Sequence, residues 1–116
     1  MAPSVWDVVR VPFPYTDRPI RQRRPALVVA MPDKGANPGL LWVLMITSGQ
    51  NRGWDGDVVI TEFASAGLPV LSLVRTEKIA TIELRDAEPI GQLGPAEQRA
   101  VAARLQQNLG AAGWPQ

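Results

Sequence analysis

The sequence predicts a mainly β protein, a small SH3-like antiparallel barrel with one C-terminal helix. Five or six short apolar runs are separated by turn residues along most of the chain. Near the end, the apolar residues change from the period of a strand to the period of a helix. With 116 residues the chain has the length of one domain with a single hydrophobic core, so we expect residues 1–116 to form one domain.

Strands are expected where apolar and β-branched residues gather, at residues 6–11, 27–31, 40–47, 58–61, 71–75 and 79–84. Pro12 and Pro14 donate no backbone hydrogen bond, so the first strand should end there or lie at a sheet edge. Its apolar residues do not alternate cleanly, and its two faces stay unassigned. Residues 62–69 fit either a turn of helix or a loop.

The run at 40–47 is the strongest predicted strand, and it ends abruptly in hydroxyl and amide side chains from Thr47 to Asn51. Polar residues at the end of a rigid strand are a common place for a functional site. The alternative is an ordinary turn in which the hydroxyls bond the local backbone.

The predicted helix covers residues 95–109. Pro95 suits a first helical position, and Val101, Leu105 and Leu109 fall on one face. Gly110 is expected to end the helix. This amphipathic helix should pack against the barrel.

Composition limits the chemistry. The chain has no Cys and no His, so thiol nucleophiles, thiolate metal sites and histidine acid–base catalysis are excluded. The longest apolar run, residues 40–46, is too short to cross a bilayer, and no secretion signal precedes the first strand. We therefore expect a soluble cytoplasmic protein without a membrane partner.

The net charge is only +1, but residues 1–30 carry a net of +3. Most of this charge lies in the expected loop at residues 15–22 and just after it. Such a segment could grip a polyanion, although a solvated loop is the simpler explanation.

Two further groups of residues could serve a phosphodiester. If residues 73–78 are extended, Arg75 and Glu77 point to the same face, where a guanidinium fork and a carboxylate could share one ligand or form a surface ion pair. Pro25 favours an extended backbone at Arg24, which would hold that guanidinium for a negatively charged transition state. Thr47 and Ser48 could hydrogen-bond the same phosphate.

Six segments, taken in order, resemble the MazF/PemK family of toxin–antitoxin ribonucleases. They are Asp-Val-Val-Arg-Val-Pro-Phe at 7–13, Arg-Pro-Ala-Leu-Val-Val at 24–29, Ile-Thr-Ser at 46–48, Gly-Leu-Pro at 67–69, Val-Arg-Thr-Glu-Lys-Ile at 74–79 and Leu-Gly-Pro at 93–95. The resemblance implies a metal-independent and cofactor-free endoribonuclease. It would cut single-stranded RNA at selected sequences by attack of the ribose 2′-hydroxyl, leaving a 2′,3′-cyclic phosphate and a 5′-hydroxyl.

The resemblance also implies roles for particular residues. Arg24 and Thr47 match the catalytic pair of the family, and Arg75 and Glu77 match a second catalytic pair of the Kid/PemK branch, which has Asp where this chain has Glu77. Glu77 would take the 2′-hydroxyl proton, while the arginines stabilise the phosphorane. The expected RNA contacts are Tyr15, Arg18, Arg21, Arg23, Ser48, Gln50, Trp54 and Lys78.

The sequence departs from the family pattern at two places. Trp6 stands where a Gly commonly precedes the Asp of the first strand, and the loop after Pro14 lacks the usual Gly and carries Pro19. The first difference bears on the start of the strand, and the second on the preference for RNA sequence.

The resemblance implies a homodimer and a cognate antitoxin whose acidic or disordered tail covers the basic groove, with the toxin–antitoxin complex binding DNA. A CcdB-like toxin that inhibits gyrase without cleaving RNA is the alternative, and its activity would depend on C-terminal residues such as Trp114 rather than on Arg24. An adaptor barrel without toxicity is the third possibility.

Overall fold

The computed structural model describes residues 3–13, 22–32, 39–51 and 53–113. Within them the strands are β1 (Asp7–Phe13), β2 (Gln22–Ala30), β3 (Leu40–Ser48), β4 (Asp57–Ile60), β5 (Ser72–Glu83) and β6 (Glu88–Gln92). Two short 3-10 turns, η1 (Gly49–Asn51) and η2 (Leu84–Asp86), and one helix, α1 (Pro95–Ala111), complete the described elements.

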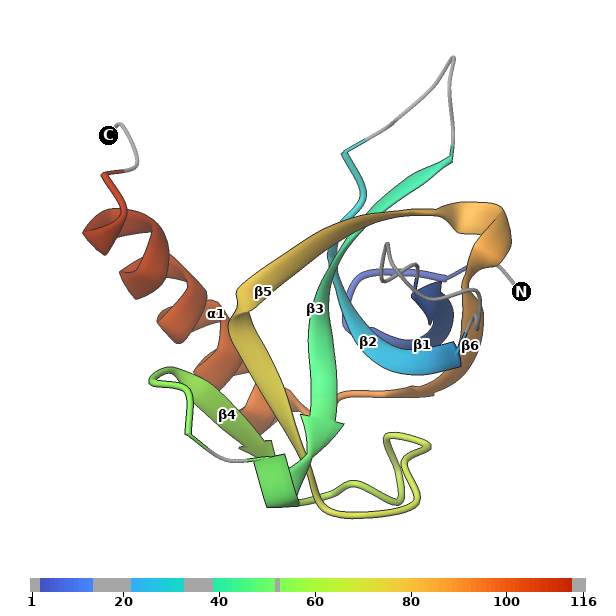
Figure 1. Ribbon diagram of the computed structural model, residues 1–116, viewed down its shortest axis with the longest axis horizontal. Coiled ribbons are helices and arrows are strands. Elements are labelled where there is room, and N and C mark those ends of the chain that lie inside the picture. The colour runs from blue at the N-terminus through green and yellow to red at the C-terminus, as the bar shows by residue number, and fades with distance from the viewer. Residues whose placement is uncertain (1–2, 14–21, 33–38, 52, 114–116) are drawn as a thin grey trace.

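The strands form one antiparallel sheet in the order β4-β5-β3-β2-β1-β6. The sheet curls into a half-barrel, and α1 packs beside β4 and β5 (Figure 1). This arrangement confirms the predicted fold class. No helix in the described part of the chain is long and apolar enough to cross a bilayer.

The curled sheet buries apolar side chains on both of its faces. Leu44 and Ile46 of β3 belong to a core cluster that includes Val101 of α1. Leu41 and Val43 belong to a second cluster on the other face. The same division explains the irregular pattern of the first strand, in which Val8 packs in one cluster and Val9 and Val11 in the other.

The first two strands are longer than predicted. Pro12 lies within β1 and pairs with Arg23, while the pairing of β1 with β6 ends at Arg10. At Pro12 the sheet therefore continues on one side only, where the missing N–H is tolerated. Because β2 begins at Gln22, Arg23 and Arg24 lie on a strand rather than after a loop.

The two strands predicted at residues 71–75 and 79–84 are parts of the single strand β5, which runs from Ser72 to Glu83. The ladder with β3 is interrupted by a large bulge, since Arg75 pairs with Met45 and Ile79 pairs with Leu44. Residues 76–78 are thus extra on the β5 side. The strand β6 was not predicted.

The helix continues beyond its predicted end. Gly110 lies inside α1, and the chain first turns left-handed at Gly113, where φ is +90°. A glycine just past the last helical turn is the usual site of that conformation, so the stop signal is Gly113 rather than Gly110.

Trp6 has a positive φ of +75°, a region that favours glycine. Its N–H donates to the carbonyl of Val28 at 2.8 Å, and its own carbonyl accepts from the N–H of Leu93 at 3.0 Å. These two hydrogen bonds hold the entry to β1 between β2 and the end of β6. The structure thus has a left-handed residue at the position where the resemblance leads us to expect Gly.

Candidate active site

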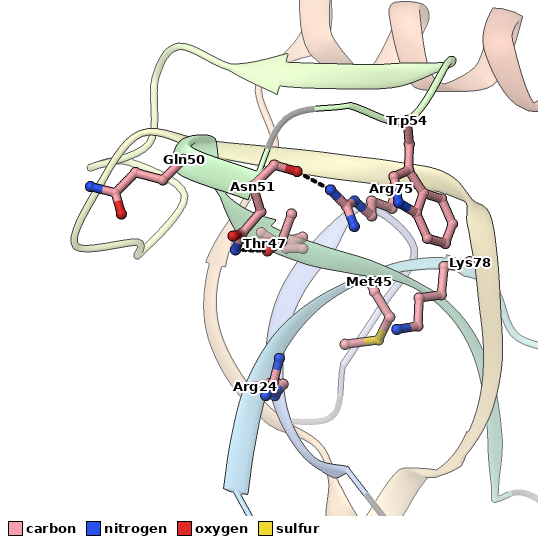
Figure 2. Close-up of a pocket in the computed structure, with 9 residues that line it drawn as sticks. Arg24, Met45, Thr47, Gln50, Asn51, Trp54, Arg75 and Lys78 are labelled. Carbon is pink, nitrogen blue, oxygen red and sulfur yellow. Dashed lines mark hydrogen bonds between the residues drawn. The ribbon is translucent and has the colours of Figure 1, made fainter. Parts of the chain in front are cut away.

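A cleft of about 500 Å³ lies where β2, β3 and β5 come together with η1 (Figure 2). Arg24 comes from β2, Thr47 from the end of β3, and Arg75 and Lys78 from β5. The described residues that line it are Arg24, Met45, Ile46, Thr47, Gln50, Asn51, Trp54, Arg75 and Lys78. Three cationic side chains and one hydroxyl thus share one space.

Contacts on several sides fix the guanidinium of Arg75. Its Nη2 donates to the backbone carbonyl of Asn51, and its Cζ lies 4.6 Å from the centre of the Trp54 ring. Its Nε lies 3.7 Å from Oδ2 of Asp57, and the two side chains are only 14% and 10% exposed. The position of this positive charge is therefore set before any ligand arrives.

Asp57 is the carboxylate that supports Arg75 from behind. Both of its oxygens are buried and have no hydrogen-bond partner among the described residues. It does not line the cleft. Asp57 therefore acts on the site through Arg75.

Thr47 lies at the wall between this cleft and a neighbouring cavity of about 660 Å³. The second cavity shares Arg24 and Thr47 with the first, and it adds Arg10, Arg23 and a partly apolar wall at residues 68–70. None of the described residues that line either cavity is acidic. A negatively charged polymer could therefore lie across Arg24 and Thr47, with a basic surface on either side.

Glu77 does not belong to this site. It is exposed and lines a third cavity, of about 480 Å³, between β5 and α1, together with Asp55 and Arg104. The prediction that Arg75 and Glu77 share a face is wrong, because the bulge at 76–78 breaks the two-residue period of the strand. Lys78, three residues after Arg75, is the side chain that returns to the cleft.

Thr76, between Arg75 and Glu77, connects strand β5 to helix α1. Thr76 is buried, and its Oγ1 donates to the carbonyl of Gly56 at 2.8 Å. The same oxygen accepts from Nδ2 of Asn108 on α1, also at 2.8 Å. Successive residues of β5 thus serve the helix and the cleft.

Apart from Glu77, the predicted site residues divide into three sets. Arg24, Thr47, Gln50, Trp54, Arg75 and Lys78 line the first cavity. Arg23 and Ser48 line the second, while Tyr15, Arg18, Arg21 and also Trp114 lie outside the described residues. The structure therefore brings together three of the four predicted catalytic residues, and leaves out Glu77.

Two of the predicted RNA contacts, Ser48 and Arg23, also bond neighbouring residues, while a third, Gln50, points away from the other cleft residues. The side chain of Gln50 extends away from the cluster around Arg75 (Figure 2). The hydroxyl of Ser48 accepts from the backbone N–H of Gln50 at 3.3 Å, as expected of a local Ser turn. Arg23 lies 3.4 Å from Glu88 in an exposed ion pair.

Asn51 and Asp57 were not predicted as site residues. Asn51 stands four residues after Thr47, and its Nδ2 donates to Oγ1 of Thr47 at 2.8 Å. The polar run that ends the third strand was the available signal for Asn51. Asp57 had no comparable signal, because only the pairing of β4 with β5 places it opposite Arg75.

Solved structures with a similar fold include MazF toxins and a mycobacterial endoribonuclease. MazF from Deinococcus radiodurans in crystal Form-I has a TM-score of 0.70 and 23% identity, over 95% of this chain and 98% of that one. The toxin MazF-mt6 of Mycobacterium tuberculosis has a TM-score of 0.70 and 21% identity, over 90% and 96%. A mycobacterial endoribonuclease in complex with its cognate antitoxin has a TM-score of 0.73 and 20% identity, over 98% and 100%.

At these identities the likeness to solved structures concerns the fold. A search of curated proteins gave no significant match. The sequence does match, over residues 4–109, the family described as PemK-like, MazF-like toxin of type II toxin-antitoxin system. With that match and the curled sheet described above, the chain belongs to the PemK-like and MazF-like toxins of type II toxin–antitoxin systems.

Proposed function

We propose that this toxin is a metal-independent endoribonuclease that cuts single-stranded RNA. The observation that supports this most is that Arg24, Arg75, Lys78 and Thr47 line one cleft, whose described lining has no acidic side chain. Such a site favours a phosphate, and it favours a phosphorane with more negative charge even more. The proposal applies the chemistry of the family to these residues.

In the proposed reaction the ribose 2′-oxygen attacks the adjacent phosphorus. A bond forms between that oxygen and phosphorus, and the bond to the 5′-oxygen breaks. The 2′-hydroxyl loses its proton and the departing 5′-oxygen gains one, so the products are a 2′,3′-cyclic phosphate and a 5′-hydroxyl end. Arg24 and Arg75 stabilise the charge of the phosphorane, because a guanidinium is too basic to carry the proton.

RNA contacts are proposed on both sides of the scissile phosphate. Trp54 is 46% exposed although Arg75 lies over its ring, and the rest of the indole offers a surface for an unpaired base. On the other side, Arg23 and Ser48 line the second cavity. An unpaired strand suits this surface better than a duplex, since stacking requires a base that is free of its partner.

A cognate antitoxin is the proposed protein partner. Several of the similar solved structures are complexes of MazF with MazE or of an endoribonuclease with its antitoxin. An acidic segment of an antitoxin would complement the basic cleft and exclude RNA from it. We also propose a cytoplasmic homodimer, as the family resemblance implies. Inhibition of gyrase is not favoured, because the chain matches the family of PemK-like and MazF-like toxins.

The test is incubation of the purified toxin with a long single-stranded RNA in EDTA, followed by mapping of the cut sites and their end groups. Discrete cuts that leave a cyclic phosphate, and that disappear in Arg24→Ala, support the proposal. Arg85→Ala is the matched control, because it removes the same charge from an 80% exposed side chain in η2. The proposal is refuted if the RNA stays intact when it is incubated with folded toxin and the same toxin still arrests growth when it is expressed in cells.

A further inference from the structure

Asn51 connects two of the residues proposed to act on the phosphate. Its side-chain Nδ2 donates to Oγ1 of Thr47 at 2.8 Å, and its backbone carbonyl accepts from Nη2 of Arg75 (Figure 2). Asn51 lines both of the cavities that meet at Thr47. One residue thus touches the hydroxyl through its side chain and the guanidinium through its backbone.

The backbone around Asn51 is held by its neighbours. The N–H of Gly49 donates to the carbonyl of Leu71 at 2.9 Å, which ties η1 to the segment just before β5. A Cβ at Gly49 would come within 3.3 Å of that carbonyl oxygen, so the close approach suits a glycine. The turn therefore presents Asn51 to Thr47 and Arg75 in a defined orientation.

The hydrogen bond to Thr47 decides where the hydroxyl proton can point. A threonine hydroxyl has one proton to donate and two lone pairs, whereas an amide nitrogen only donates. Asn51 therefore occupies a lone pair of Oγ1 and leaves the proton of Thr47 for another acceptor. The described lining of the cleft has no carboxylate, and the side chain of Gln50 extends away from the residues around Arg75, so that acceptor would be a phosphate oxygen (Figure 2).

We infer that Asn51 is a positioning residue that keeps the Thr47 hydroxyl oriented as a donor to the scissile phosphate. The inference rests on the proposed ribonuclease function. Asn51 acts on the reaction through Thr47, and its backbone carbonyl aligns Arg75 on the same phosphate. This role is separate from base recognition, which the exposed surface around Trp54 would provide.

The inference predicts different effects for two substitutions at the same position. Asn51→Ala removes the donor, frees the hydroxyl to rotate, and should lower kcat by about tenfold with KM changed by less than about twofold, since one exposed hydrogen bond is at stake. Asn51→Asp keeps the shape but accepts the Thr47 proton and adds a negative charge beside the phosphate. It should lower kcat by about tenfold more. Neither change removes the backbone carbonyl that Arg75 uses.

The deciding experiment is a double-mutant cycle of Asn51→Ala with Thr47→Val, measured as single-turnover cleavage of an RNA oligonucleotide in EDTA. If Asn51 acts through Thr47, its substitution should change the rate by less than about twofold in the Thr47→Val background. Gln107→Ala is the control, because it removes an exposed side-chain amide on α1, outside the cleft. Thermal unfolding verifies that each variant is folded.

The possible outcomes separate the inference from the proposed function. Wild-type activity in Asn51→Ala, together with slower cleavage by Thr47→Val and loss of cleavage in Arg24→Ala, overturns the inference and leaves the ribonuclease standing. A full additional loss on the Thr47→Val background also overturns it, because Asn51 would then act independently of the hydroxyl. Absence of cleavage by the folded wild-type protein removes the proposed function and the inference with it.

Discussion

The buried ion pair behind the cleft allows a quantitative test of how Arg75 is held. Asp57→Asn removes the carboxylate whose Oδ2 lies 3.7 Å from Nε of Arg75. At that separation the attraction is about 4.5 kcal/mol for an effective dielectric constant of about 20. The substitution also removes the cost of burying the carboxylate, but it leaves Arg75 without its counter-ion, so the net loss of unfolding free energy should be about 2–3 kcal/mol, below the roughly 3–5 kcal/mol of a fully buried pair.

A double-mutant cycle with Arg75→Met separates the two contributions. The cycle cancels the burial cost of each group and should leave most of the attraction, a coupling energy of about 3–4 kcal/mol between Asp57 and Arg75, at or above the upper end for residues in contact. Urea unfolding of the four proteins measures it. Asp55→Asn is the matched control two residues earlier, because that carboxylate pairs with Arg104 but is 93% exposed. It should have no measurable effect.

Cleavage of RNA provides a second measurement on the same variants. Asp57→Asn should lower kcat because Arg75 then has fewer contacts to hold it over the phosphate, while Asp55→Asn should leave kcat unchanged. A coupling energy below about 0.5 kcal/mol would be no larger than that of an exposed pair and would refute the idea that Asp57 holds Arg75. Cleavage at the wild-type rate in Asp57→Asn would refute its functional part.

Three further predictions concern other parts of the fold. Glu77→Gln should change the cleavage rate by less than about threefold, whereas loss of a general base would cost about a hundredfold or more, and single-turnover kinetics distinguish the two. Trp6→Gly should have a free energy of unfolding in urea about 0.5–1 kcal/mol higher than that of Trp6→Ala. Both variants lose the indole, but only glycine adopts the positive φ without strain. The difference is reduced by the greater conformational entropy of glycine in the unfolded chain. Glu97→Ala should cost about 1–2 kcal/mol, and Glu97→Gln less, since Oε2 accepts from the N–H of Thr61 at 2.6 Å; equal stability of both variants and the wild type in urea would contradict this role.

The sequence predicts best those elements whose stability is local or strongly apolar. The strand β3 is apolar from Leu40 to Ile46, and α1 begins at Pro95 with a clear helical period. By contrast, β6 has the sequence Glu-Pro-Ile-Gly-Gln and forms because it pairs with β1 and packs against the loop at Gly67. A Cβ on Gly67 would collide with the carbonyl of Ile90, and such a contact depends on the tertiary fold.

The site was predictable where family motifs mark it and not where the sheet is irregular. Arg24, Thr47 and Arg75 were each part of a recognisable segment, and the structure places them around one cleft. Glu77 was placed on the wrong face because alternation along a strand holds only while the ladder is regular. The bulge that changes its direction is set by the pairing of β5 with β3, which no local pattern indicated.

The bulge in β5 has a consequence for how such chains can vary. Arg75 pairs with Met45, and Ile79 pairs with the adjacent Leu44. The pairing of β5 with β3 would therefore be continuous if residues 76–78 were absent. The hydrogen bonds of the sheet therefore place little restriction on these three positions. The residue types at these positions are restricted instead by the hydrogen bond between Thr76 and Asn108 of α1 and by the positive charge of Lys78 in the cleft. Substitution here can retune either property while the register of every strand stays the same.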